Sequence, residues 1–303
     1  MPNVMADGAP IVSTVLSLSH WPASPTPAAL AHDLSAGTAL RYVRSRRSWP
    51  EAMAVTADHF DADGLVTLSV LTDPEWACTH APELLAVAEA GDFVRTASRD
   101  AARVAFAVDA LAAGWALGAE RNPALGGGLH RAGLDRLPRL LADPGAFRAD
   151  WAEEDAALTA AEAALESGVV LLDEVADLDL VVVTMARAGA PWHRMAVHNR
   201  TDRMRVLVLA PPHYQLYLRY ETWVRLARRP RLPLRPDLTP LAGELTAAEP
   251  SGTTWRFDGA AAIRPRLSPE SDVPSDLAPD AVRSLVEAAL ARARPGWDPY
   301  APR

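Results

Sequence analysis

The chain has 303 residues, a formal net charge of −8 and 49% apolar residues. This length and composition predict a folded protein of one large domain or two moderate ones. The negative charge argues against broad, non-specific binding of nucleic acid, although a nucleotide-sized substrate is compatible with it.

Cysteine and lysine usage excludes further classes of chemistry. Cys78 is the only cysteine, so no intrachain disulfide and no cysteine-rich zinc site can form. All 30 basic residues are arginine, so no lysine can act as a nucleophile.

The first ten residues lack the basic segment of a secretory signal. The apolar stretches 104–119 and 169–190 are too short, or too interrupted by acids, to span a membrane. We therefore expect a soluble, cytoplasmic protein with no membrane partner.

The first half of the chain predicts alternating strands and helices. Ile11–Ser17 is rich in β-branched residues and predicts a strand. Thr26 followed by Pro27 is typical of a helix start and predicts a helix to about Arg46. A strand at Ala52–Thr56 completes a strand–helix–strand unit, the beginning of a parallel sheet. Further helices are predicted at 64–71, 82–90, 99–117 and 150–168, with a glycine-rich connector at 122–128.

The second half predicts mostly strands. They span 169–172, 178–185, 195–198, 204–209, 214–220 and 253–257. An extended connector rich in proline and arginine is expected at 228–240, and a final helix at 276–293. We accordingly predict an α/β fold with a parallel-sheet lobe, residues 1–168, and a smaller β-rich lobe with a C-terminal helix, residues 169–303.

Three side chains that often bind metals alternate directly after the second predicted strand. His59, Asp61 and Asp63 occupy every second position, and Gly64 follows. Alternate side chains of an extended backbone point to one side, and two carboxylates facing one point repel each other unless a cation lies between them. The spacing therefore predicts a divalent-metal site at the end of a strand. The alternative is a surface turn whose acids are merely solvated.

The same stretch is similar to the first half of an EF-hand calcium loop. That loop needs a bidentate glutamate at its twelfth position, where this chain has Val70. An EF-hand loop also follows a helix, whereas a strand is predicted here. We exclude this interpretation. Mixed imidazole and carboxylate ligands favour Mn²⁺ or another first-row ion over Ca²⁺.

The string HFDADGLV, which begins at His59, resembles the first motif of the DHH phosphoesterase superfamily. This superfamily includes RecJ-type exonucleases, oligonucleotide-degrading phosphodiesterases and manganese-dependent pyrophosphatases. The resemblance implies a doubly wound parallel domain in which Asp61 and Asp63 each hold a different divalent metal. That metal is usually Mn²⁺, with Mg²⁺ as the other candidate, and His59 assists. The Asp58-His59 pair and the run AGDF that ends at Phe93 also resemble an uncharacterised actinobacterial family.

Other residues are candidates to complete the site. Asp92 resembles the fourth-motif aspartate of the superfamily, and Gly91 before it permits a tight bend. We predict that the Asp92 oxygens lie roughly 4–7 Å from those of the Asp61–Asp63 pair. His20 follows the first predicted strand and would reach the site if that strand neighbours the second. Asp73 is the candidate for the aspartate that bridges the metals.

The function implied is metal-dependent hydrolysis of a small phosphoester or phosphoanhydride by Asp61, Asp63 and His59, with a metal-generated hydroxide. The helix from Gly64 would offer backbone N–H groups to the substrate anion. The chain contains no Asp-His-His motif, so the alternative is a non-catalytic binding or regulatory module with a partial DHH-like site. The arginine-rich stretch 225–235 would either bind an anion or form a solvated linker.

Overall fold

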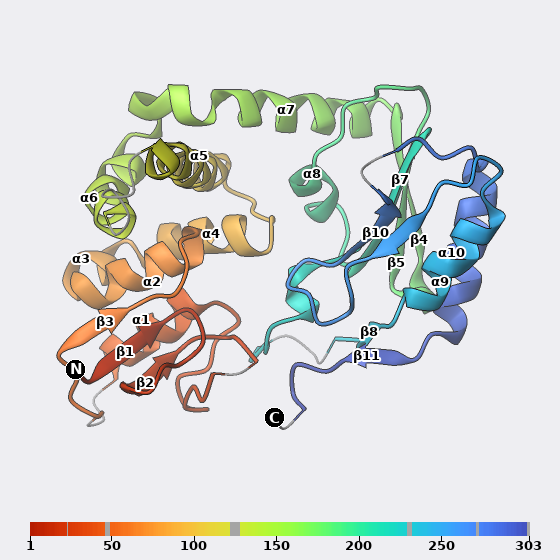
Figure 1. Cartoon of the computed structure of the whole chain (residues 1–303). Coiled ribbons are helices and arrows are strands. Elements are labelled where there is room, and N and C mark those ends of the chain that lie inside the picture. The colour runs from red at the N-terminus through yellow and green to blue at the C-terminus, as the bar shows by residue number, and fades with distance from the viewer. Residues whose placement is uncertain (23, 46–48, 122–127, 229–231, 271–272, 302–303) are drawn as a thin grey trace. The chain divides into compact units, whose positions relative to one another are not determined.

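A computed structural model describes residues 1–22, 24–45, 49–121, 128–228, 232–270 and 273–301 (Figure 1). The chain divides into two compact units. Unit 1 consists chiefly of Met1–Ala156 and Arg225–Pro230, and unit 2 of Ala157–Val224 and Arg231–Pro302. The predicted mixed α/β fold is confirmed, with a small parallel sheet in unit 1 and a larger mixed sheet in unit 2.

The sheet of unit 1 is three-stranded and parallel, in the order β2-β1-β3. Its strands are β1 (Asn3–Ala6), β2 (Thr14–Leu18) and β3 (Ala54–Thr56). All three carboxyl ends therefore meet at one edge. The central strand β1 was not predicted, because it is short and begins with an asparagine, a residue depleted in strands. It separates β2 from β3, so the expectation that the two predicted strands are neighbours is wrong.

Helices α1 (Ser35–Arg44) and α2 (Ala62–Thr72) pack against this sheet. The helix predicted from Thr26 begins only at Ser35. The Thr26 hydroxyl does not cap a helix but bonds the backbone N–H and carbonyl of Ser19, which ties the intervening loop to the end of β2. The remaining helices of this part of the chain are α3 (Pro74–Thr79), α4 (Ala81–Asp92), α5 (Arg99–Arg121), α6 (Leu129–Ala142), η2 (Pro144–Phe147) and α7 (Arg148–Glu166).

Helix α2 is the centre of unit 1, and nine of its eleven residues are buried. It contacts α1, α4 and α6 as well as the sheet, a layering that Figure 1 shows. Gly91 lies within α4 rather than at a bend, which corrects the prediction. A Cβ atom on Gly91 would lie 2.5 Å from the Ala62 Cβ atom. The glycine thus permits close approach of α4 to the start of α2.

Helix α5 contains a stretch, Arg99–Gly118, that is long and apolar enough to cross a membrane by composition alone. Core helices of soluble proteins have the same composition. Here 39% of the stretch is buried, and α5 packs against α4 and α6.

Unit 2 is built on a six-stranded sheet in the order β4-β5-β6-β7-β10-β9. Only β5 and β6 are parallel, and the other neighbours are antiparallel. Leu180 and Val182 contribute to one core and Val181 and Val183 to another, as expected of a strand buried on both faces. The elements are β4 (Val170–Val175), η3 (Ala176–Leu178), β5 (Leu180–Met185), α8 (Arg194–His198), β6 (Arg205–Ala210), β7 (His213–Leu218), η4 (Tyr220–Thr222), β8 (Arg235–Pro236), α9 (Thr239–Ala248), β9 (Trp255–Phe257), β10 (Arg266–Pro269), α10 (Pro279–Arg292) and β11 (Pro295–Trp297).

Two predictions for unit 2 need correction. The strand expected at 195–198 is the short helix α8, because His193 Nδ1 accepts a hydrogen bond from the Met195 N–H and caps it. The expected connector 228–240 contains β8 and the start of α9. Within this range, Arg235 is buried and its guanidinium donates hydrogen bonds to backbone carbonyls. Arg235 is therefore neither part of a solvated linker nor an anion-binding residue. Residues 229–231, and residues 122–127 of the predicted glycine-rich connector, lie outside the described residues.

Candidate metal centre

Asp7 follows the central strand β1 at the carboxyl edge of the sheet. Its backbone is left-handed, with φ +48°, a conformation that a non-glycine residue adopts rarely and often at functional sites. The side chain is 1% exposed, and Oδ1 accepts a hydrogen bond of 2.7 Å from the Ser35 hydroxyl. Asp7 was not predicted. Its signal is the apolar run Val4–Ala6 that ends in an Asp-Gly pair, and Asp63-Gly64 is a second such pair.

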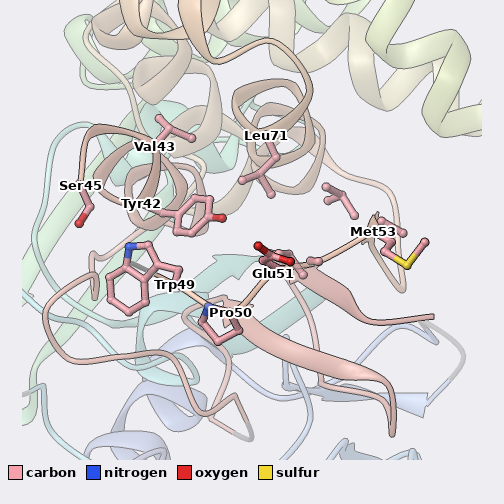
Figure 2. Close-up of a pocket in the computed structure, with 12 residues that line it drawn as sticks. Tyr42, Val43, Ser45, Trp49, Pro50, Glu51, Met53 and Leu71 are labelled. Carbon is pink, nitrogen blue, oxygen red and sulfur yellow. The ribbon is translucent and has the colours of Figure 1, made fainter. Parts of the chain in front are cut away.

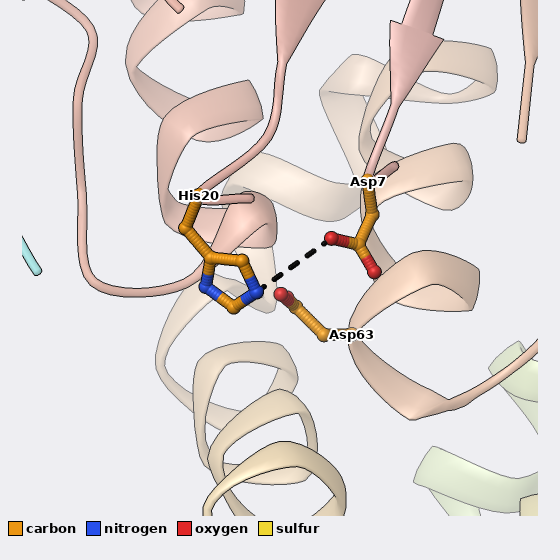
Figure 3. Close-up of side chains that lie close together, drawn as sticks. All are labelled: Asp7, His20 and Asp63. Carbon is orange, nitrogen blue, oxygen red and sulfur yellow. Dashed lines mark ion pairs between the residues drawn. The ribbon is translucent and has the colours of Figure 1, made fainter. Parts of the chain in front are cut away.

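A first group of possible ligands consists of Asp7, His20 and Asp63, all buried, with ligand atoms within 4.8 Å of one another (Figure 3). His20 Nε2 lies 3.7 Å from Asp7 Oδ1 and 3.4 Å from an oxygen of Asp92. His20 Nδ1 lies 2.7 Å from the Asp33 carbonyl oxygen. Because a carbonyl only accepts, Nδ1 carries the proton and Nε2 faces the carboxylates.

Asp63 is fully buried, so the surface-turn alternative does not describe it. Its carboxylate accepts hydrogen bonds from the backbone N–H groups of Ser35, at 2.8 Å, and Ala36, at 2.9 Å. Asp63 thereby caps helix α1, whose own N-cap residue provides no side-chain bond. Each carboxylate oxygen can accept more than one bond, so this cap leaves acceptor capacity for a metal ion.

A second group consists of Asp7, His59 and Asp61. His59 Nε2 lies 3.2 Å from Asp7 Oδ2 and 3.1 Å from Asp61 Oδ2. The other ring nitrogen, Nδ1, lies 2.7 Å from Asp58 Oδ1. A carboxylate on the far side of a histidine fixes the ring orientation of many metal ligands. The His59 and Asp61 side chains are 30% and 29% exposed, so this side of the centre is open to solvent.

Gly8 permits the contact between β1 and the segment after β3. Its φ is +147°, and a Cβ atom would lie 2.4 Å from an Asp58 carboxylate oxygen. The same carboxylate accepts a hydrogen bond from the Ala9 N–H. Asp58 thus connects the loop after Asp7 to His59.

The centre concentrates negative charge in a buried place. Burial and the neighbouring Asp7 carboxylate raise the pKa of Asp63 to about 7. Burial lowers the pKa of His59, but its contacts with Asp61 and Asp7 outweigh this and raise that pKa to about 12. Protons therefore balance the carboxylates when no metal is bound, and an entering cation must displace them.

These pKa shifts predict how the stability of the metal-free protein depends on pH. Asp63 binds its proton more tightly in the folded chain than in the unfolded chain, where the value is near 3.8. Its contribution to stability is therefore full below about pH 3.8 and is lost as the pH rises from there to about 7. His59 acts in the same direction, since its contribution decreases above about pH 6.5.

We expect the Tm of the metal-free wild type to fall more steeply than that of Asp63→Asn between about pH 4 and about pH 7. Thermal melts followed by circular dichroism at several pH values measure both slopes. The two slopes of Tm against pH are compared, and not the Tm values themselves, because Asp63→Asn also weakens the cap of α1. Parallel slopes in the two proteins would contradict the raised pKa of Asp63.

The structure brings together most of the predicted site residues. His59, Asp61, Asp63 and His20 all lie in the two groups, and Asp92 contacts the first group through His20. Asp73, the candidate for a bridging aspartate, lies in neither group. It follows α2 and caps α3 by accepting from the Trp76 N–H, about 15 Å along the helix from Asp63. The Gly64 N–H, expected to bind substrate, donates to Asp61 Oδ1 at 2.8 Å.

A pocket of about 800 Å³ lies elsewhere in unit 1 (Figure 2). Its lining includes Tyr42 near the end of α1, Leu71 near the end of α2, and Ala54 at the start of β3. These are the ends of the elements opposite to Asp63 and His59. The pocket shares no residue with the two ligand groups, so it is a separate feature of the unit.

Nearly the whole chain, residues 1–301, matches the model of one protein family, described as a family of unknown function (DUF6687). No curated protein and no solved structure matches the chain. The function must therefore be inferred from the chain's own residues.

Proposed function

The chain belongs to this family of unknown function, and from its own residues we propose that it is a divalent-metal-dependent hydrolase of small phosphoesters or phosphoanhydrides. The observation that carries the proposal is the shared position of Asp7. One of its oxygens faces His20 and the other faces His59. A carboxylate common to two ligand groups suits two metal ions about 4 Å apart.

The donor atoms fit such ions. The two groups offer imidazole nitrogens and carboxylate oxygens, which suit Mn²⁺, with Mg²⁺ as the alternative. Asp7 Oδ2 is buried and accepts no well-directed hydrogen bond from the residues that the structure describes, although His59 lies beside it. Both histidines direct Nε2 at the centre and have a hydrogen-bond partner on Nδ1, the arrangement usual for metal-binding histidines.

The burial of the ligands suggests separate roles for the two sides. Asp63, His20 and Asp92 are buried and would hold an ion away from solvent. His59 and Asp61 are partly exposed and would hold the ion that a substrate reaches. Bound ions would lower the pKa of water and neutralise charge on phosphoryl oxygens. The resemblance of the HFDADGLV string to the DHH superfamily supports the same chemistry.

The second candidate is a non-catalytic module. Two observations favour it: the absence of an Asp-His-His motif in the sequence, and the use of Asp63 as the cap of α1. In that case His59 and the carboxylates would form a self-neutralising structural network, and the protein would bind a partner or ligand without hydrolysing it.

Metal binding is the first step of the test, because the hydrolase requires a metal and the non-catalytic module does not. We expect saturating Mn²⁺ to stabilise the wild type by about 2.7 kcal/mol at a hundredfold excess over Kd. The Asp61→Asn, Asp63→Asn double variant should gain almost nothing, because each group loses a ligand. Thermal shift with and without Mn²⁺ measures the difference. Equal shifts in both proteins, or none in either, would contradict the metal centre.

Catalysis is the second step of the test. The Mn²⁺-loaded wild type should hydrolyse an activated phosphodiester, a short oligonucleotide or pyrophosphate. Asp63→Ala should abolish that hydrolysis and keep the far-UV circular dichroism spectrum of the wild type. A metal-loaded protein that is inactive on all three substrates would favour the non-catalytic module.

A further inference from the structure

A short segment from the second half of the chain is part of unit 1. Residues Arg225–Arg228 follow strands β4 to β7 in the sequence and pack beside the loop that carries His20. The Arg225 N–H donates to the His20 carbonyl at 2.9 Å. The N–H groups of Ala227 and Arg228 both donate to Asp33 Oδ1, at 2.7 and 2.8 Å.

Asp33 connects this segment to His20 through two different atoms. Its side chain accepts the two N–H groups of the segment, and its backbone carbonyl accepts His20 Nδ1–H. Asp33 is 8% exposed and His20 is 3% exposed. A buried charge that accepts two N–H bonds is strongly held, because charge-assisted hydrogen bonds exceed neutral ones in strength.

The geometry points to Asp33 as a positioning residue for His20, and to Arg225–Arg228 as the segment that holds both in place. This inference rests on the proposed metal centre. His20 is held at its carbonyl by Arg225 and at Nδ1 by Asp33, so its Nε2 stays directed at Asp7 and Asp92. Metal affinity at the buried side of the centre thereby depends on residues about 190 positions further along the chain.

The test is Mn²⁺ affinity in the full chain, measured by electron paramagnetic resonance titration. Asp33→Asn keeps the size of the side chain and removes its charge. We expect Mn²⁺ to bind this variant about tenfold more weakly, because a neutral amide oxygen holds the two N–H groups less strongly than a carboxylate does, which loosens the Asp33 carbonyl that orients His20. Hydrogen exchange of the Ala227 and Arg228 amides should accelerate in the same variant, with or without Mn²⁺.

Asp143→Asn is the matched control. Asp143, the N-cap of η2, also accepts a backbone N–H, from Ala146, and it lies outside both ligand groups. Asp143→Asn should bind Mn²⁺ as the wild type does. If Asp33→Asn also retains wild-type affinity while the wild type binds Mn²⁺, the positioning role is overturned. If the wild type itself binds no Mn²⁺, the proposed function fails, and the positioning role fails with it.

Discussion

Asp7→Asn is expected to abolish Mn²⁺ binding on both sides of the centre, whereas Asp61→Asn should affect only the solvent-exposed side. Asp7 is the one residue that both ligand groups share. Asparagine tolerates the left-handed backbone at this position better than most residues, and its carbonyl oxygen can still accept the bond from the Ser35 hydroxyl. The substitution therefore removes a charge and a metal ligand with little change of shape. Isothermal titration with Mn²⁺ measures the number of ions bound by each variant.

The metal-free Tm of Asp7→Asn provides the control for folding. Asp7 raises the pKa of Asp63 through charge repulsion, so its neutralisation should make the Tm of the metal-free protein less dependent on pH. A variant that melts cooperatively and binds no Mn²⁺ would support Asp7 as the shared ligand. Undiminished Mn²⁺ binding by Asp7→Asn would remove the observation on which the proposed function depends.

Gly91→Ala is expected to destabilise unit 1 by about 1–3 kcal/mol, the usual cost of excess volume in a packed core. The new methyl group would lie 2.5 Å from the Ala62 Cβ atom and 3.6 Å from its Cα atom. Neither atom belongs to a flexible side chain, so α4 must move away from the start of α2. That movement would shift Asp92, the next residue, away from His20. Denaturant melts should show the lost stability, and Mn²⁺ affinity should fall as well.

Gly114→Ala is the matched control for this prediction. Gly114 is also a helix residue, in α5, and a Cβ atom there would meet nothing within 4 Å. Alanine favours the helix over glycine by about 1 kcal/mol, so this variant should be slightly more stable than the wild type. Two Gly→Ala substitutions in helices are thus expected to act in opposite directions. If Gly91→Ala is as stable as the wild type or more stable, as expected for Gly114→Ala, the contact between Gly91 and Ala62 is not tight.

The sequence predicted a helix after the acidic motif, and α2 begins there, at Ala62 rather than Gly64. The expected extended backbone with His59, Asp61 and Asp63 on one side is wrong, because Asp63 lies in the first turn of α2. Asp61 caps α2 by accepting the Gly64 N–H, as the position of acids before an apolar helix suggests. His20 was also placed near the motif, although for the wrong reason. His20 follows β2, which is adjacent to β1 and not to β3. It reaches the centre because it faces Asp7, which follows β1.

Asp7 and Asp33 could not be found in the same way. Asp7 follows a strand of four residues, too short for an alternating pattern to stand out. Asp33 acts through hydrogen bonds to residues far along the chain, and no local spacing encodes such contacts. Likewise, the cap that Asp63 provides for α1 joins residues 27 and 28 positions apart. Long-range hydrogen bonds of this kind emerge only from tertiary structure.

The position of Arg225–Arg228 has a consequence for how the protein is made. During synthesis from the N-terminus, the two ligand groups and Asp92 have left the ribosome long before Arg225 appears. A fragment that ends at residue 168 would contain every proposed ligand, yet His20 and Asp33 would lack the three N–H donors that hold them. Maturation of the centre would then be a late event of biosynthesis. A fragment chosen by its sequence composition alone would lack the segment that holds its own centre in place.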